Sequence, residues 1–486
     1  MDIKVVLRLM SKLSLAFSAV IIVPLLAALF KDRDNVWLFA VTLIVSLAMA
    51  LIFQSCGSQK SAMRLRVREA VAVMGCGWLY VCVMGALPYF LSGILDPVTA
   101  VFESVAGFTT TGVTTVDSFS RFPDSILVWR CLTHWCGGIG VIMLFIIIMP
   151  QMTGSTSYLF NAELPGGMAE RTLPRIKESA LMILSVYMGL IIIEIILLLL
   201  GGIDLLRAIN MAIATMATGG FSFYQEGLLA FDSLYVECVA VIFMIIASTN
   251  FALYYKLWHG DWQELAGEVE YKCYFAVLGT AAVLLTANLY LTGYIGDFGE
   301  ALRKGIFQAV SFGSTTGFAS DDFSRWPGFC QYILFLLMFI GGCSGSTAGG
   351  IKIIRLLILL KAAWVELLHT LHPRMVQAVR VGGRTIEPHI VGNVTRFFFL
   401  YIFAFMVMSI LISLCGFTVI DSMGIIAATM SSVGPAFGAF GPTESYGMLP
   451  LFGRIVIICS MLLGRLEIFT LLVLLRPDFW GKRSNW

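Results

Sequence analysis

The chain has 486 residues, of which 58% are hydrophobic and only 13% are charged, and its mean hydropathy is +0.88. This composition excludes an ordinary soluble domain and indicates an all-α polytopic membrane protein in contact with lipid. The formal net charge of +2 points to no particular partner and gives no reason to expect nucleic-acid binding.

Two apolar segments, at about 8–30 and 36–53, open the chain. Three basic residues precede the first segment, as in a signal peptide. No clear small-residue cleavage site follows, however, and the second apolar run begins at once, so we interpret both segments as transmembrane helices. They have no counterpart later in the chain, and we assign residues 1–68 to an added N-terminal pair.

Four units with the same order of elements follow. Each contains a long apolar helix, a short helix, a stretch rich in hydroxyl residues and glycine, and a second long apolar segment. Helices of about 20 residues span a bilayer, whereas the short helices reach only part of the way. The four units have the predicted bounds 69–170, 171–269, 270–389 and 390–486. Their short helices are predicted at about 97–109, 204–217, 301–314 and 421–431. Their second long helices are predicted at about 124–150, 232–256, 327 onward and 449–475, for a total of about ten spans.

The stretch after each short helix places a hydroxyl residue two positions before a glycine. Such glycines recur about 100 residues apart, which indicates four copies of one unit around a pseudo-fourfold axis. Non-helical backbone at membrane depth is tolerated where it is buried in protein or lines a water-filled cavity. Four such loops around one axis would form a ring of carbonyl oxygens that replaces the water around an alkali cation. Alternatively, each glycine only allows close helix packing.

The candidate filter residues are Thr110, Thr111, Gly112, Thr218, Gly219, Gly220, Thr315, Thr316, Gly317, Ser432, Val433 and Gly434.

Lysine and arginine residues indicate the orientation. If both termini and the linkers before each repeat lie inside, more than twice as many basic residues fall on the inner side as on the outer side. The four loops then enter the membrane from outside. Acidic residues that would line an outer vestibule follow the glycines, although each is equally typical of a solvated loop: Asp117, Glu226, Asp321, Asp322 and Glu444. Glu103, in the first short helix, is predicted to accept backbone hydrogen bonds from its loop.

The third repeat has a glycine-rich interruption at 341–350 within its second apolar segment. Glycine costs a helix interior up to about 1 kcal/mol relative to alanine, so this run is predicted to be a non-helical intramembrane loop and a gate candidate. Arg465 lies deep in the last apolar segment and is predicted to face the cavity below the filter. Glu194 is a second intramembrane charge, which we interpret as a helix–helix hydrogen bond or, second, as part of a proton relay.

Several of these segments resemble the Trk-type bacterial potassium uptake transporters of the Trk/Ktr/HKT superfamily, over essentially the whole chain. The resemblance rests on the four loops, the two extra helices, the Pro174-Arg175 linker, the run from Gly341 to Lys352 and the run from Gly464 to Thr470.

The resemblance implies K⁺ as the bound substrate, no organic cofactor in this chain, and the four loop glycines as filter residues. The resemblance also implies that the glycine at position 112 favours K⁺ over Na⁺. It further implies a multi-pass protein of the bacterial cytoplasmic (inner) membrane, with both termini cytoplasmic. Relatives look like homodimers on a cytosolic ring of nucleotide-binding (NAD/ATP-type) regulatory subunits. The gating residues that it implies are Gly345, Ser346, Thr347, Gly349, Gly350, Lys352 and Arg465.

Three alternatives remain at this stage. The first is a Na⁺-permeable or proton-coupled cation symporter that uses Glu194. The second is a membrane-embedded enzyme, which the lack of a metal or nucleophile motif disfavours. The third is a sensor or scaffold with an inactive pore. The eleven cysteines are scattered, with no C-x-x-C motif, and are interpreted as unreactive buried thiols.

Overall fold

The computed structural model describes residues 1–57, 67–140, 173–223, 227–231, 233–258, 260, 267–466 and 468–481. These residues are mostly helical, with one small hairpin of β1 (Arg380–Val381) and β2 (Arg384–Thr385). Outside the described residues lie most of the linker before the first repeat, the far half of the helix predicted at 124–150, Glu226, and Glu467 within the run from Gly464 to Thr470.

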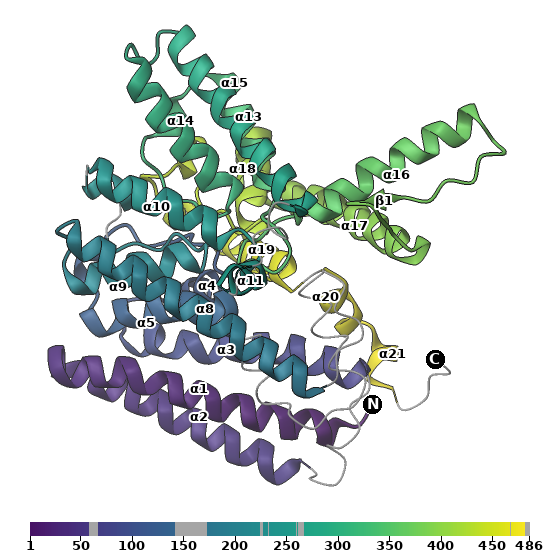
Figure 1. The fold of residues 1–486 in the computed structure, drawn as a ribbon. Coiled ribbons are helices and arrows are strands. Elements are labelled where there is room, and N and C mark those ends of the chain that lie inside the picture. The colour runs from purple at the N-terminus through teal and green to yellow at the C-terminus, as the bar shows by residue number, and fades with distance from the viewer. Residues whose placement is uncertain are drawn as a thin grey trace.

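The two helices predicted at the N-terminus are α1 (Ile3–Lys31) and α2 (Val36–Cys56). They lie side by side along one edge of the molecule (Figure 1). The hydroxyl of Ser14 donates to the carbonyl oxygen of Ser46 at 2.7 Å between them.

The first two helices of every repeat match the expected pattern. The long first helices are α3 (Val67–Leu91), α8 (Leu173–Leu200), α13 (Val269–Leu291) and α17 (Pro388–Ser413). The short second helices are α4 (Pro97–Phe108), α9 (Leu205–Met216), α14 (Phe298–Gly313) and α18 (Val419–Met430). Three of the short helices begin at a capping side chain, from Asp96, Asp297 or Thr418, that accepts a hydrogen bond from a backbone N–H in the first turn.

The last segment is broken in three of the repeats, and only the break in the third repeat was predicted. In the first repeat, α5 (Asp124–Trp135) runs into a π-helical turn. The others are the pairs α10 (Leu234–Ala247) with α11 (Phe251–Trp258), α15 (Gly328–Phe339) with α16 (Ile353–Leu371), and α19 (Leu451–Arg465) with α20 (Ile468–Leu474). A short helix α21 (Pro477–Trp480) follows.

The prediction of one continuous helix over 232–256 is therefore wrong. Helices α10 and α11 meet at an angle of 98°. The hydroxyls of Ser248 and Thr249 donate to carbonyls three residues earlier, and Asn250 accepts from the backbone N–H of Ala252 at 2.9 Å. Such local side-chain bonds compete with the helical ladder and end it.

Among the described residues, six helices are long and apolar enough to cross a membrane, or up to eight if each bent pair counts as one span. Large apolar side chains are exposed on these helices, for example Ile44, Leu51, Ile192 and Val283. Such apolar exposure is expected where lipid covers the protein. Helix α16 extends away from the body of the molecule together with α17 (Figure 1).

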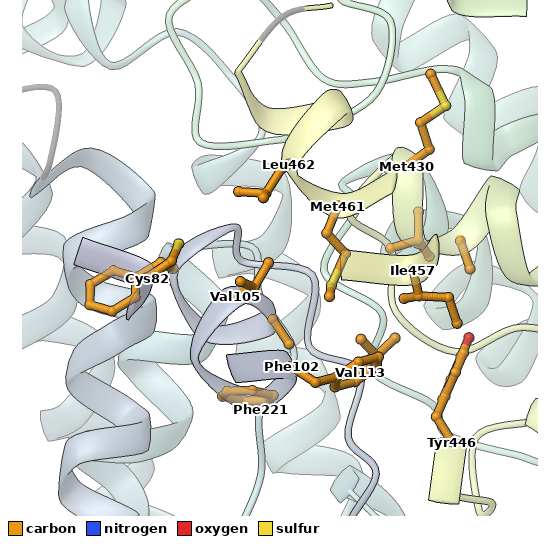
Figure 2. Close-up of a cluster of buried hydrophobic side chains, with 14 of the residues drawn as sticks. Cys82, Phe102, Val105, Val113, Phe221, Met430, Tyr446, Ile457, Met461 and Leu462 are labelled. Carbon is orange, nitrogen blue, oxygen red and sulfur yellow. The ribbon is translucent and has the colours of Figure 1, made fainter. Parts of the chain in front are cut away.

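The first and fourth repeats meet through a buried apolar cluster. Figure 2 shows Phe102 and Val105 of α4 beside Val113, with Ile457 and Met461 of α19 facing them. All five side chains are at most 2% exposed. Within a membrane, close van der Waals packing of such side chains stabilises the contact between helices. The two ends of the repeated part of the chain are thus packed against each other.

Candidate ion pathway

The four loops after the short helices share one backbone conformation. The hydroxyl residue of each loop has a positive φ, between 50° and 58°, and the glycine two positions later has a φ between 74° and 101°. Among the described residues, the non-glycine positions with positive φ are these four hydroxyl residues: Thr110, Thr218, Thr315 and Ser432. This conformation costs an L-residue about 1–2 kcal/mol. The same unusual shape at four equivalent positions supports the interpretation of four copies of one loop.

Each loop is anchored to its own short helix through the residue before the glycine. The backbone N–H of that residue donates to a carbonyl oxygen five positions earlier, at 2.8–3.0 Å, in all four repeats. In the described part of the chain, no backbone N–H donates to the carbonyl oxygen of the same residue. These carbonyl groups belong to Thr111, Gly219, Thr316 and Val433.

The same four carbonyl oxygens define a ring. A Cβ atom added to any of the loop glycines would overlap the carbonyl oxygen of the residue before the glycine in the next loop. The four contacts are Gly112 with Gly219, Gly220 with Thr316, Gly317 with Val433, and Gly434 with Thr111. Because the fourth loop contacts the first, the loops close around one axis. Glycine is required at these positions both for its positive φ and because any side chain would displace a carbonyl group of the ring.

A different side chain braces the outer part of each loop. Glu103 accepts from the N–H of Thr115 at 2.7 Å, which confirms the predicted backbone hydrogen bond. In the third loop, Ser311 Oγ donates to the carbonyl oxygen of Phe318 at 2.6 Å. In the fourth loop, the Tyr446 hydroxyl donates to the carbonyl oxygen of Gly434 at 2.9 Å. The second loop is held by Arg130 Nη1, which donates to the carbonyl oxygen of Ser222 at 3.0 Å.

The packing behind the ring also differs between repeats. In the first and third repeats, the hydroxyl before the glycine pairs with another hydroxyl two residues earlier, at 2.8 Å in both cases. In the second repeat Gly219 has no side chain, and the imidazole of His134 occupies the adjacent space. In the fourth repeat Ser431 pairs with the Tyr401 hydroxyl at 2.8 Å. The four loops therefore share one backbone conformation, whereas the side chains packed behind them differ between repeats.

The glycine-rich segment at 341–350 is non-helical, as predicted, and lies between α15 and α16. A parallel bridge between Ile340 and Ile351 closes its two ends. The N–H of Gly349 donates to Thr315 Oγ1 at 2.7 Å, and Thr347 Oγ1 donates to the carbonyl oxygen of Met216 at 3.0 Å. The segment is therefore in direct contact with the third loop and with the end of the second short helix.

Arg465 joins this segment to the first repeat. Its Nη2 donates to the carbonyl oxygens of Gly137 at 2.6 Å and Gly138 at 3.0 Å, and its Nη1 donates to that of Thr347 at 3.2 Å. That the guanidinium faces the cavity below the filter stays a prediction. The structure adds that the guanidinium is engaged by three backbone carbonyls from two repeats.

Two further charged groups hold the 341–350 segment. Lys352 Nζ donates to the carbonyl oxygens of Ala348 at 2.7 Å and Ser346 at 3.2 Å. Glu270, at the start of α13, accepts from the N–H of Ser344 at 2.7 Å and from its hydroxyl at 3.1 Å. Glu270 was not predicted, since nothing in its local sequence marks it. Arg130 and His134 were missed as well, although two polar residues four positions apart in an apolar helix are a usable signal.

The acidic residues of the expected outer vestibule are largely engaged by other side chains. Asp321 lies 3.3 Å from Lys304 Nζ and accepts from the indole of Trp326 at 3.0 Å. Asp322 lies 2.8 Å from Arg325 Nε, and Asp117 accepts from the hydroxyl of Ser445. Lys304 and Arg325 therefore offset much of the negative charge that the sequence predicted for the outer vestibule.

Glu194 lies in α8 and is fully buried. Its side chain interacts with the hydroxyl of Thr215 in α9, although the described groups around it form no hydrogen bond of good geometry. The expected helix–helix hydrogen bond stays a prediction.

A helical, multi-pass membrane protein with four loops closed into a ring of carbonyl groups belongs to the class of membrane cation transport proteins rather than to the enzymes. The sequence model of the TrkH family, described as a cation transport protein, matches residues 39–482. The chain therefore belongs to the TrkH family.

Known relatives resemble the chain over its full length. It is 32% identical to a Trk system potassium uptake protein TrkH of Halomonas elongata, over 99% of this chain and 100% of the relative. The identity and coverage are the same for the Trk system potassium uptake protein TrkH of Escherichia coli K12. The crystal structure of the potassium transporter TrkH from Vibrio parahaemolyticus superimposes with a TM-score of 0.90 at 29% identity, over 99% of this chain and 100% of that one. The fold class and the family resemblance inferred from the sequence are confirmed.

Proposed function

We propose that this protein takes up K⁺ across the bacterial cytoplasmic membrane through the ring of the four loops. The observation that carries the proposal is the cyclic contact of each loop glycine with a carbonyl oxygen of the next loop. Carbonyl oxygens that accept no backbone N–H are suited to replace the water around a dehydrated alkali cation. A negative cell interior would supply about 2.3 kcal/mol per charge for each 100 mV.

The 341–350 segment is proposed as the gate of this pathway. It contacts Thr315 on the filter loop and is held from three directions, by Arg465, Lys352 and Glu270. Movement of the segment would have to break these hydrogen bonds, so a regulator that acts on the inner side could control opening by offsetting their loss.

The assembly inferred from the resemblance completes the proposal. The relatives' names describe a Trk system, which fits a transporter with further subunits. We propose a homodimer with both termini cytoplasmic, on a ring of nucleotide-binding regulatory subunits.

The test is uptake of ⁸⁶Rb⁺ into proteoliposomes under an imposed membrane potential, with Na⁺ as competitor. We expect Rb⁺ uptake that Na⁺ inhibits only weakly. Absence of uptake at every potential and with every regulator would refute transport, and equal entry of Na⁺ and Rb⁺ would refute selectivity.

A proton-coupled mechanism is the second candidate, because Glu194 is a fully buried carboxyl group within an apolar helix. Carboxyl groups inside membrane-spanning helices are typical members of proton relays. If uptake is proton-coupled, a pH gradient alone drives Rb⁺ entry and Glu194→Gln abolishes that response. If the pathway is channel-like, the pH gradient drives none.

A further inference from the structure

A buried ion pair lies behind the first two loops. Arg130 of α5 and Glu103 of α4 approach to 3.5 Å between Nε and Oε2, and their side chains are 4% and 2% exposed. The backbone contacts that close the carbonyl ring involve neither side chain.

The two members of the pair hold different loops. Glu103 Oε1 accepts from the Thr115 N–H at 2.7 Å and from the Thr114 hydroxyl at 2.8 Å, both just after the first glycine. Arg130 Nη1 donates to the carbonyl oxygen of Ser222, just after the second glycine, at 3.0 Å. The position of one loop is thus linked to that of the next through a single pair of charges.

Aromatic rings enclose the guanidinium and leave it little freedom. Its central carbon lies 3.4 Å from the centre of the Phe221 ring and 4.4 Å from that of Phe119. His134, one turn further along α5, packs against the same phenylalanine at 4.0 Å between ring centres. Phe221 itself lies close to the first short helix (Figure 2). A cation between two aromatic faces is held more firmly than by the ion pair alone.

The other repeats have no such pair. At the same distance before the loop glycine, the position of Glu103 is taken by Met211, Gln308 or Ile425. At the same distance from the start of the second helix, the position of Arg130 is taken by Ala240, Leu334 or Ile457. The other three repeats therefore form the same helices with apolar or neutral residues at both positions. A buried ion pair is costly to desolvate and is seldom more stabilising than apolar packing, which argues against a role in stability alone.

We propose that the Arg130–Glu103 pair is a positioning element for selectivity: it sets the separation of the first and second loops and so opposes contraction of the carbonyl ring around Na⁺. This inference rests on the proposed K⁺ pathway. A ring that is braced at its K⁺ spacing must deform to coordinate the smaller Na⁺, whereas a ring with two unbraced loops deforms more easily.

The test compares ⁸⁶Rb⁺ and ²²Na⁺ uptake by the full-length protein in proteoliposomes. We expect Arg130→Gln and Glu103→Gln to lower the ratio of Rb⁺ to Na⁺ uptake about tenfold, which corresponds to about 1.4 kcal/mol. Arg130→Lys keeps the charge opposite Glu103 but lacks the second arm that reaches Ser222, so its ratio falls by a smaller factor. If the glutamine variants do not fold, the uptake ratio of Arg130→Lys tests the inference instead.

The matched control is Arg303→Gln. Arg303 makes two hydrogen bonds to Glu237, at 2.7 and 2.9 Å, between α14 and α10 and away from the loops. We expect this variant to keep the wild-type ratio. An unchanged ratio in the Arg130 and Glu103 variants, or an equal fall in the control, would overturn the inference. No Rb⁺ uptake by the wild-type protein would instead refute the proposed function.

Discussion

Replacement of Gly317 by alanine tests the carbonyl ring with the smallest possible change. The glycine has a φ of +76°, so any other residue incurs the left-handed cost of about 1–2 kcal/mol. The new methyl group would also overlap the carbonyl oxygen of Val433 and lie 2.9 Å from Pro435 Cδ. The carbonyl oxygen of Val433 belongs to the backbone and cannot move away by a change of rotamer. The carbonyl group must therefore leave its position in the ring.

Gly293→Ala is the matched control for this variant. Gly293 lies in the same repeat, at the end of α13, and has a φ of +70°, but no atom of the described residues lies within 4 Å of an added methyl group. Both variants therefore incur the cost of a positive φ, but only Gly317→Ala displaces a carbonyl group.

The assay is ⁸⁶Rb⁺ uptake per folded protein, with folding checked by size-exclusion chromatography. We expect Gly293→Ala to keep near wild-type uptake and Gly317→Ala to lose at least about tenfold, equivalent to about 1.4 kcal/mol. A β-branched residue at position 317 should abolish uptake. Full uptake in Gly317→Ala would show that the contact with Val433 does not form part of the conduction path. An equal loss in both variants would show that strain alone is responsible.

Three further predictions concern the gate. Arg465→Ala removes three hydrogen bonds to backbone carbonyls, and we expect Rb⁺ leak without a regulator to rise several-fold; leak at the wild-type level would contradict a gating role. Glu270→Ala leaves the N–H of Ser344 without its acceptor and should raise leak by a smaller factor, with the Rb⁺ to Na⁺ ratio unchanged; a changed ratio would place Glu270 in the filter instead. Shortening the 341–350 segment by two residues should raise leak as well, and tight closure in that variant would exclude the segment as the gate.

The repeated loop could be predicted from the sequence because its pattern lies within a short stretch of the chain. A hydroxyl residue, a glycine two positions later and a preceding short helix recur four times, and the short helices lie within a few residues of their predicted positions. Glu103 was also accessible, since a carboxylate in an apolar short helix needs donors and the nearest ones are the backbone groups of its own loop.

The breaks in the second helices were less accessible. The third repeat has a long glycine-rich run, and its break was predicted. In the second repeat the helix ends at Ser248, Thr249 and Asn250, which are tolerated within many membrane helices. Their hydrogen bonds to nearby backbone groups end the helix here, and no count of apolar residues contains that information.

The sequence by itself determined that the protein lies in a membrane, that it contains four copies of one unit of long helix, short helix and loop, and that the third copy carries a non-helical insertion. These properties depend on composition and on spacing along the chain. Only the tertiary structure decided which loop follows which around the axis, and that the 341–350 segment contacts Thr315 and Arg465. It also decided that one ion pair of the first repeat serves two loops. Those contacts join residues that are up to several hundred positions apart, and they form only when the four repeats close into a ring.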